Sequence, residues 1–179
     1  TDDERADSHA RRPDDPWPDV SEAHLLQTLE TWLVPFFRGA RKLGELQRLK
    51  AEDVLPSIIP WEQQKRLDAL APIHWQVPSG SNIRFRYFEN GGAPVMEVRL
   101  QEVFGLHETP AVNDGRTNVV MHLLSPGYKP VQVTQDLKSF WNTTYSDVRK
   151  ELRRRYPKHS WPEDPWTAQA VRGARRRTS

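Results

Sequence analysis

Residues 83–100 read IRFRYFENGGAPVMEVRL, and this stretch decides the fold class. Apolar and charged side chains alternate on both sides of an Asn-Gly-Gly run, which predicts two strands joined by a hairpin turn. A turn centred on Asn90-Gly91 pairs Phe85 with Met96. A turn centred on Gly91-Gly92 shifts the pairing by two residues and keeps the same faces. With either turn, one face of the hairpin is apolar and the other carries alternating charge.

Further strands are expected on both sides of this hairpin, at 74–78, 118–124 and 130–134. Asn113-Asp114-Gly115 predicts a loop before the strand at 118–124, which is the fourth when the hairpin strands are counted. The pattern therefore predicts a small, mostly antiparallel sheet over residues 73–135, which can curl into a partly open barrel. The apolar face of the hairpin needs cover, and either the N-terminal helices or the segment 137–156 can provide it.

The segment before the sheet, residues 20–72, has helical periodicity. Ser21 is a suitable N-cap, and apolar residues follow at helical spacing as far as Phe36, with Pro35 expected to kink or end the helix. A second pattern runs through residues 43–49, and residues 54–59 continue it or form a short third piece. Another helix begins near Pro60, where Trp61 and Leu67 mark one face and Pro72 stops it.

After the sheet, residues 136–156 are predicted to form two short helices. Asp136 is expected to cap a helix over 137–142, and Ser146 a basic helix over 147–156 that packs on the sheet. Val148, Leu152 and Tyr156 share the face expected to meet the core. Residues 157–166 are rich in proline and tryptophan and are expected to be extended. The predicted class is α+β.

The composition suits one domain with polar ends. Of 179 residues, 36% are hydrophobic and 28% charged, and cysteine is absent, which excludes disulfides and thiolate metal sites. No apolar run is long enough to span a membrane, and no leader is evident, so we expect a cytoplasmic protein. We expect a flexible acidic lead-in over residues 1–19, a single domain over 20–166 and a disordered basic tail over 167–179.

The sequence holds no recognisable catalytic constellation. Neither the G-x-x-x-x-G-K-[ST] motif nor the G-x-G-x-x-G motif, which bind nucleotide phosphates, occurs in the sequence. His74 and His122 are isolated among apolar residues, and His107 and Glu108 are adjacent, so neighbouring strand positions point them apart. We therefore expect no metal site, no bound cofactor and no catalytic residue in this chain.

The positive signal is a basic C-terminal region. Residues 137–179 contain eleven basic and four acidic residues. Such a region suits nucleic acid, an acidic protein surface or simple solubility. The candidate nucleic-acid-binding residues are Arg149, Lys150, Arg153, Arg154, Arg155, Lys158, Arg175, Arg176 and Arg177. Candidates for stacking on bases are Tyr156, Trp161 and Trp166.

Several long motifs resemble the C-terminal region of the HrpB-type DEAH-box ATP-dependent helicases of bacteria. They are VPSGS at 77–81, RLQEVFG at 99–105, LLSP at 123–126, PVQVT at 130–134, VRKELR at 148–153, RYPKH at 155–159 and WPEDP at 161–165. The resemblance extends over residues 22–166. It implies two RecA-like motor lobes, with ATP and Mg²⁺, elsewhere in the enzyme. This chain lacks their Walker and D-E-x-H motifs, so no catalytic residue carries over, and it resembles a C-terminal fragment.

The resemblance implies an accessory domain of an RNA helicase that is not an enzyme on its own. We expect the basic helix to help bind RNA or single-stranded DNA beside the motor domains of the same helicase. The alternative is a docking or regulatory module that binds a protein partner without touching nucleic acid. The two differ in salt dependence, which is steep for phosphate contacts and weak for docking through aromatic residues.

Overall fold

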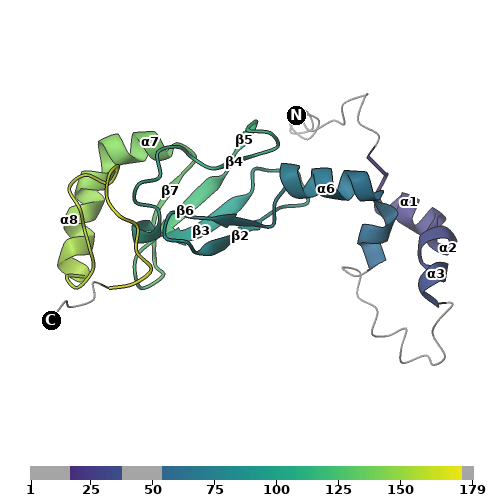
Figure 1. The fold of residues 1–179 in the computed structure, drawn as a ribbon, viewed down its shortest axis with the longest axis horizontal. Helices are drawn as coiled ribbons and strands as arrows, with labels where there is room; N and C mark the ends of the chain where they lie inside the picture. The colour runs from purple at the N-terminus through teal and green to yellow at the C-terminus, as the bar shows by residue number, and fades with distance from the viewer. Residues whose placement is uncertain (1–16, 38–53, 175–179) are drawn as a thin grey trace, which may run out of the picture. The chain divides into compact units, whose positions relative to one another are not determined.

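The structure is a computed structural model that describes residues 17–37 and 54–174. The chain divides into two compact units, Thr1–Asp68 and Ala69–Ser179. Helices make up the first unit, and the second combines a sheet with helices (Figure 1). The α+β class is therefore confirmed. The assignment of residues 20–166 to a single domain stays a prediction.

The first unit begins with three short helices where the periodicity predicted one kinked helix. They are α1 (Glu22–Gln27), α2 (Leu29–Trp32) and α3 (Val34–Phe37). Ser21 caps α1 as expected, since its hydroxyl accepts from the His24 amide. The break falls at Thr28, whose hydroxyl donates to the His24 carbonyl at 2.8 Å and so competes with the helical ladder. Pro35 lies inside α3.

A 3₁₀ turn, η2 (Leu55–Ile58), and a longer helix, α6 (Trp61–Leu70), follow. The expected apolar face of α6 is not buried. None of its residues is buried, and the side chains of Trp61 and Leu67 are 65% and 39% exposed. The helical pattern predicted at 43–49 lies outside the described residues.

The second unit is organised around a five-stranded sheet. Its order is β1-β2-β3-β6-β7, and a separate two-stranded hairpin joins β4 to β5. Neighbouring strands are antiparallel except for β3 and β6, which are parallel. The strands are β1 (His74–Gln76), β2 (Asn82–Arg86), β3 (Val95–Arg99), β4 (Ala111–Val112), β5 (Thr117–Asn118), β6 (Val120–Leu124) and β7 (Pro130–Thr134).

The β2–β3 hairpin has the register of the Asn90-Gly91 turn. Phe85 pairs with Met96, and Arg86 pairs with Val95. Gly91 adopts a φ of 69° at this turn, a conformation that costs glycine little, and its amide donates to the Phe88 carbonyl at 3.1 Å. The alternative turn on Gly91-Gly92 is therefore wrong.

The helical segment after the sheet is continuous where two helices were predicted. It passes from α7 (Leu137–Ser139) through a π-helical turn, η4 (Phe140–Thr144), into α8 (Tyr145–Arg155). Asp136 caps α7 as expected, accepting from the Ser139 amide at 2.8 Å. Ser146, the second residue of α8, is not a cap, because the helical backbone runs through it without a break.

The core of the second unit lies between the sheet and this helical segment. Phe85, Met96, Val98, Met121 and Leu123 enter it from the strands. In the π-helical turn each hydrogen bond spans one residue more than in an α-helix. Three aromatic side chains enter the core at or beside this turn. They are Phe140, Trp141 and Tyr145, each at most 5% exposed. The cover for the hairpin's apolar face thus comes from residues 137–155, one of the two expected sources.

The last described segment, residues 157–174, has no regular secondary structure and is held by hydrogen bonds. The Gly105 amide donates to the Pro165 carbonyl at 2.8 Å, and the Val171 amide to the Gln101 carbonyl at 3.0 Å. Residues 167–174, assigned above to a disordered tail, therefore pack on the unit. We call residues 157–174 the C-terminal strap.

Candidate nucleic-acid interface

Helix α8 divides its residues between the core and solvent as its periodicity predicted. Leu152 is buried, and Val148 and Tyr156, the residue after the helix, pack against the core at partial burial. The basic side chains lie around the rest of the helix. Of these, Arg153 and Arg154 are exposed, in the last turn, where the partial negative charge of the helix end favours cations.

Arg149 is engaged within the protein and differs in this from the other basic residues of α8. Its Nε donates to the Trp161 carbonyl at 2.9 Å, and its Nη2 donates to Glu163 at 3.0 Å. Its side chain is only 18% exposed. Arg149 therefore joins the C-terminal strap to α8, and we assign it a structural role in place of the predicted binding role.

The other predicted basic residues of this helix point to solvent. Lys150 pairs with Asp147 at 3.0 Å, with both side chains more than 70% exposed, so this pair stabilises the fold little. The guanidinium of Arg155 lies over the Tyr156 ring at 5.8 Å. We call the exposed set the α8 basic face. Its members are Lys150, Arg153, Arg154, Arg155 and Lys158.

A polar groove of about 510 Å³ lies between α8 and the strap. Arg149, Arg153 and His159 line it, together with Glu163. Burial, and secondarily the nearby positive charge of Arg99, lower the pKa of His159 below its usual 6.5. At neutral pH the groove therefore holds two guanidinium groups and an uncharged imidazole.

The structure separates the three stacking candidates. Trp161 is 8% exposed and donates from its indole to the Tyr156 carbonyl at 2.8 Å. Its ring belongs to the core, so it is not available to stack on a base, and the prediction for Trp161 is wrong. Tyr156 is half-buried, with its hydroxyl 3.3 Å from that of Ser125. Trp166 is half-buried, with its ring edge against His107 at 5.5 Å.

The tail arginines Arg175, Arg176 and Arg177 lie outside the described residues. Arg172, which belongs to the same basic tail, is described. Its guanidinium donates to the carbonyls of Ser79 and Gly80, which ties the strap to the loop between β1 and β2.

A buried ionic network, which the sequence analysis did not predict, supports this loop. Glu102, 3% exposed, lies in the 3₁₀ turn η3 (Leu100–Glu102). It accepts from Arg99 at 3.0 Å and from the Ser81 hydroxyl at 2.9 Å. A glutamate between Leu100 and Val103 was the available signal, because a carboxylate in an apolar run needs partners when buried.

The described residues were also compared with the requirements of metal binding and of membrane crossing. Among residues 17–37 and 54–174, no cluster of three His, Cys, Asp or Glu side chains is placed to hold a metal ion. Within the same ranges, the helices are too short or too polar to cross a membrane. The α8 basic face, the polar groove and the surface of the sheet remain as candidate binding surfaces.

Comparison with known proteins identifies the family. Residues 32–165 match the family model described as ATP-dependent helicase C-terminal, HrpB_C. The chain belongs to this family. The matched residues include η2, the whole sheet, the continuous helical segment and the first part of the C-terminal strap. The resemblance drawn from the sequence motifs is confirmed.

A curated relative and two solved structures resemble this chain. The chain is 44% identical over 153 residues to the ATP-dependent RNA helicase HrpB of Escherichia coli (strain K12), covering 86% of this chain and 19% of the relative. A crystal structure of the E. coli DExH-box NTPase HrpB matches with a TM-score of 0.83 at 42% identity, over 89% of this chain and 20% of that one. A crystal structure of the E. coli DEAH/RHA helicase HrpB matches with a TM-score of 0.69 at 41% identity, over 83% and 19%.

The chain thus spans about a fifth of the length of the relatives it matches. It corresponds to the C-terminal part of an ATP-dependent helicase.

Proposed function

We propose that this chain is an accessory domain that helps an ATP-dependent RNA helicase hold single-stranded nucleic acid. The ATPase motor, with its ATP and Mg²⁺, lies in other domains of the same protein. The domain supplies binding surface and no catalytic group. Its partners in this proposal are RNA, or single-stranded DNA, and the motor domains.

The observation that carries the proposal is the exposure of the α8 basic face. Four arginine and lysine side chains there, Arg153, Arg154, Arg155 and Lys158, project into solvent within six residues of sequence. No carboxylate of the described residues lies within ion-pairing distance of these four. Three unpaired arginines at the end of a helix, with Lys158 just beyond it, suit the regularly spaced phosphates of a nucleic-acid strand.

The proposal predicts a salt-dependent contribution to binding. Each phosphate neutralised releases condensed counterions, and the logarithm of the association constant falls by about 0.7 per phosphate for each logarithmic unit of salt on a single strand. Replacing Arg153, Arg154 and Lys158 with glutamine in the whole helicase should weaken RNA binding at low salt. It should also reduce the salt slope by about 2.

A charge-matched control separates this effect from a general loss of positive charge. Replacement of Lys65, Arg116 and Lys138 with glutamine removes the same net charge from exposed positions outside the α8 basic face. We measure binding to labelled single-stranded RNA by fluorescence anisotropy at several salt concentrations. If the α8 triple variant and the control give the same slope as the parent, the α8 basic face is not a phosphate-binding surface.

The exposed apolar residues of the first unit favour the docking alternative for that unit. Leu26 and Trp61 are 63% and 65% exposed, and none of the four helices α1, α2, α3 and α6 has a buried residue. Large exposed aromatic and aliphatic side chains are typical of protein–protein contacts. Replacing both residues with serine should weaken association with the motor domains without changing the salt dependence of RNA binding.

A further inference from the structure

One face of the five-stranded sheet in the second unit is open to solvent. A row of residues crosses all five strands: His74 pairs with Arg84, Glu97 pairs with His122, and His122 pairs with Val133. Arg84 and Glu97 lie one position beyond the Phe85–Met96 pair that joins β2 to β3. Four of the five side chains are exposed and the fifth, His122, is partly exposed. The adjacent row on the other face, which includes Phe85, Met96 and Met121, is buried in the core. The sheet therefore has one packed face and one open face.

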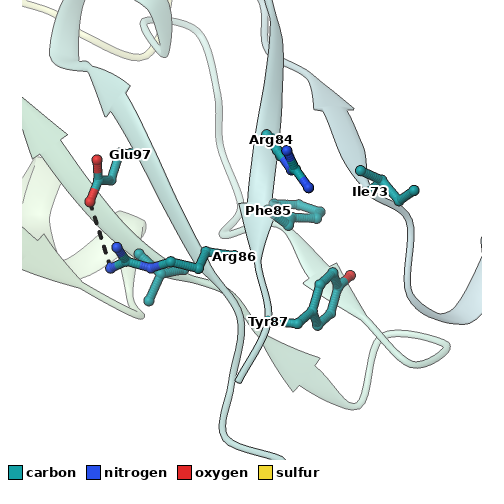
Figure 2. A pocket seen from close by; sticks show the side chains of 7 residues that line it. Ile73, Arg84, Phe85, Arg86, Tyr87 and Glu97 are labelled. Carbon is teal, nitrogen blue, oxygen red and sulfur yellow. Dashed lines mark ion pairs between the residues drawn. The ribbon is translucent and has the colours of Figure 1, made fainter. Parts of the chain in front are cut away.

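The open face carries arginines around a hollow at its β2 side. The hollow, about 560 Å³ in volume, is lined by Arg84, Arg86, Glu97 and Tyr87, among others. Figure 2 shows Arg86 extending toward Glu97, with Tyr87 pointing away from them. The distance between the Arg86 and Glu97 charged atoms is 3.7 Å, and both side chains are more than half exposed. Glu97 also lies 3.8 Å from the Nδ1 atom of His122. The lining of the hollow thus contains two arginines and one carboxylate.

An exposed aromatic ring stands at each end of this face, against an arginine. Arg86 lies over the Phe88 ring at 5.4 Å, and Arg99 lies over the Tyr128 ring at 5.1 Å. Phe88 is 43% exposed and Tyr128 66% exposed. Tyr128 also has a φ of 59°, a left-handed conformation that is costly for an aromatic residue. Its ring is thus displayed at a strained turn.

The Tyr128 end of the open face lies beside the end of α8. The Tyr156 hydroxyl contacts Ser125, and Lys129 and Arg155 line one small cavity. A strand of nucleic acid that leaves the α8 basic face at Arg155 therefore reaches Tyr128 next. Val95 of β3 pairs with Arg86, and Arg99 lies four residues further along the same strand. This separation corresponds to about 13 Å. That length suits about four nucleotides at helical stacking distance.

We propose that the open face of the sheet, from Tyr128 to Phe88, binds a single strand of nucleic acid by base stacking. Bases stack on the exposed sides of the Tyr128 and Phe88 rings, whose other sides are occupied by arginine. Arg84 and Arg86 meet the phosphates, and Arg86 exchanges Glu97 for a phosphate as the strand binds. Aromatic rings interleaved with cations on an open sheet are a recurrent means of holding single strands. This inference rests on the proposed function and names a second surface for it.

Photocrosslinking in the whole helicase tests the inference. A short single-stranded RNA carrying 4-thiouridine is irradiated with the protein, and crosslinked peptides are mapped by mass spectrometry. We expect crosslinks at Phe88 and Tyr128. Tyr128→Ala should abolish the crosslink at that position and weaken binding about fivefold or more, whereas Tyr128→Phe keeps the ring and both signals. Val20→Ala, which trims an exposed apolar side chain of the first unit that has no assigned binding role, is the control and should change neither.

The outcomes separate this inference from the proposed function. Crosslinks confined to α8, with Tyr128→Ala binding RNA as the parent does, would overturn the sheet surface and leave the α8 basic face standing. Absence of crosslinks throughout residues 69–174, with unchanged affinity in the α8 triple variant, would overturn both. An unchanged melting temperature for Tyr128→Ala shows that any loss of binding does not come from unfolding.

Discussion

Replacement of Trp141 by alanine is expected to remove much of the stability of the second unit. Trp141 is 5% exposed, and its ring centroid lies 5.0–6.1 Å from those of Phe140, Tyr145 and Phe104. Its indole also donates to the Leu106 carbonyl at 2.9 Å. Deletion of a buried aromatic side chain costs about 3–5 kcal/mol, since it forfeits hydrophobic transfer and leaves a cavity. The variant also leaves the Leu106 carbonyl without its indole donor, which moves the expected cost toward the upper half of that range.

Thermal unfolding followed by far-ultraviolet circular dichroism measures this effect. A domain of this size loses roughly 2–4 °C of melting temperature per kcal/mol, so Trp141→Ala should melt about 8–20 °C below the parent. Trp141→Phe keeps a ring and loses the indole donor, and should cost about half as much. Trp61→Ala, at a side chain 65% exposed, should stay within about 0.5 kcal/mol. A melting temperature for Trp141→Ala within about 2 °C of the parent would refute this account of the core.

Two further predictions concern the strap and the polar groove. Arg149→Met removes the donors to Trp161 and Glu163, so it should lower the free energy of unfolding by about 2 kcal/mol. It should also raise the rate of amide hydrogen exchange over residues 157–166. The control Lys150→Met should change the free energy of unfolding by less than about 0.5 kcal/mol, because the pair that it breaks is exposed. The pKa of His159 is lowered in the folded state, so the unfolded chain binds its proton more readily. The stability from the neutral imidazole is therefore present above about pH 6.5 and is lost as pH falls through the folded-state pKa. His159→Phe should flatten that part of the stability–pH curve measured by urea unfolding, and an unchanged curve would exclude His159 as its source.

Local patterns in the sequence predict the faces of the strands and the hairpin pairing, because both depend on residues that are close together in the chain. Alternation of Phe85 and Arg86 fixes the faces of β2, and the observed pairing of Phe85 with Met96 is the one expected for a turn centred on Asn90-Gly91. Alternation does not specify which strands are neighbours. The parallel pairing of β3 with β6, across the β4–β5 hairpin, is therefore absent from the prediction.

The predicted boundaries fail where a local signal competes with packing. Ser146 has the chemistry of an N-cap, but the burial of Phe140 and Tyr145 favours a continuous helical backbone through a π-helical turn. Thr28 interrupts a pattern that periodicity alone assigns to one helix.

The candidate site was predicted in part. Clustering of basic residues on α8 is visible in the sequence, because helical periodicity separates them from Val148 and Leu152. The engagement of Arg149 and the burial of Trp161 are not visible, since both depend on where the irregular strap lies. Prolines and charges around Trp161 suggest solvent exposure, whereas its contacts come from residues distant in sequence.

The C-terminal strap has a consequence for how this domain folds during its synthesis. Arg172 bonds to Ser79 across 93 residues of sequence. Trp161 completes a core that Val77 and Phe85 begin about 80 residues earlier. A ribosome adds about 5–20 residues each second, so the first strands wait several seconds for their last packing partners. The sheet spends that interval with part of its apolar face uncovered. The nascent chain at that stage is the form of this protein most exposed to aggregation and to capture by chaperones.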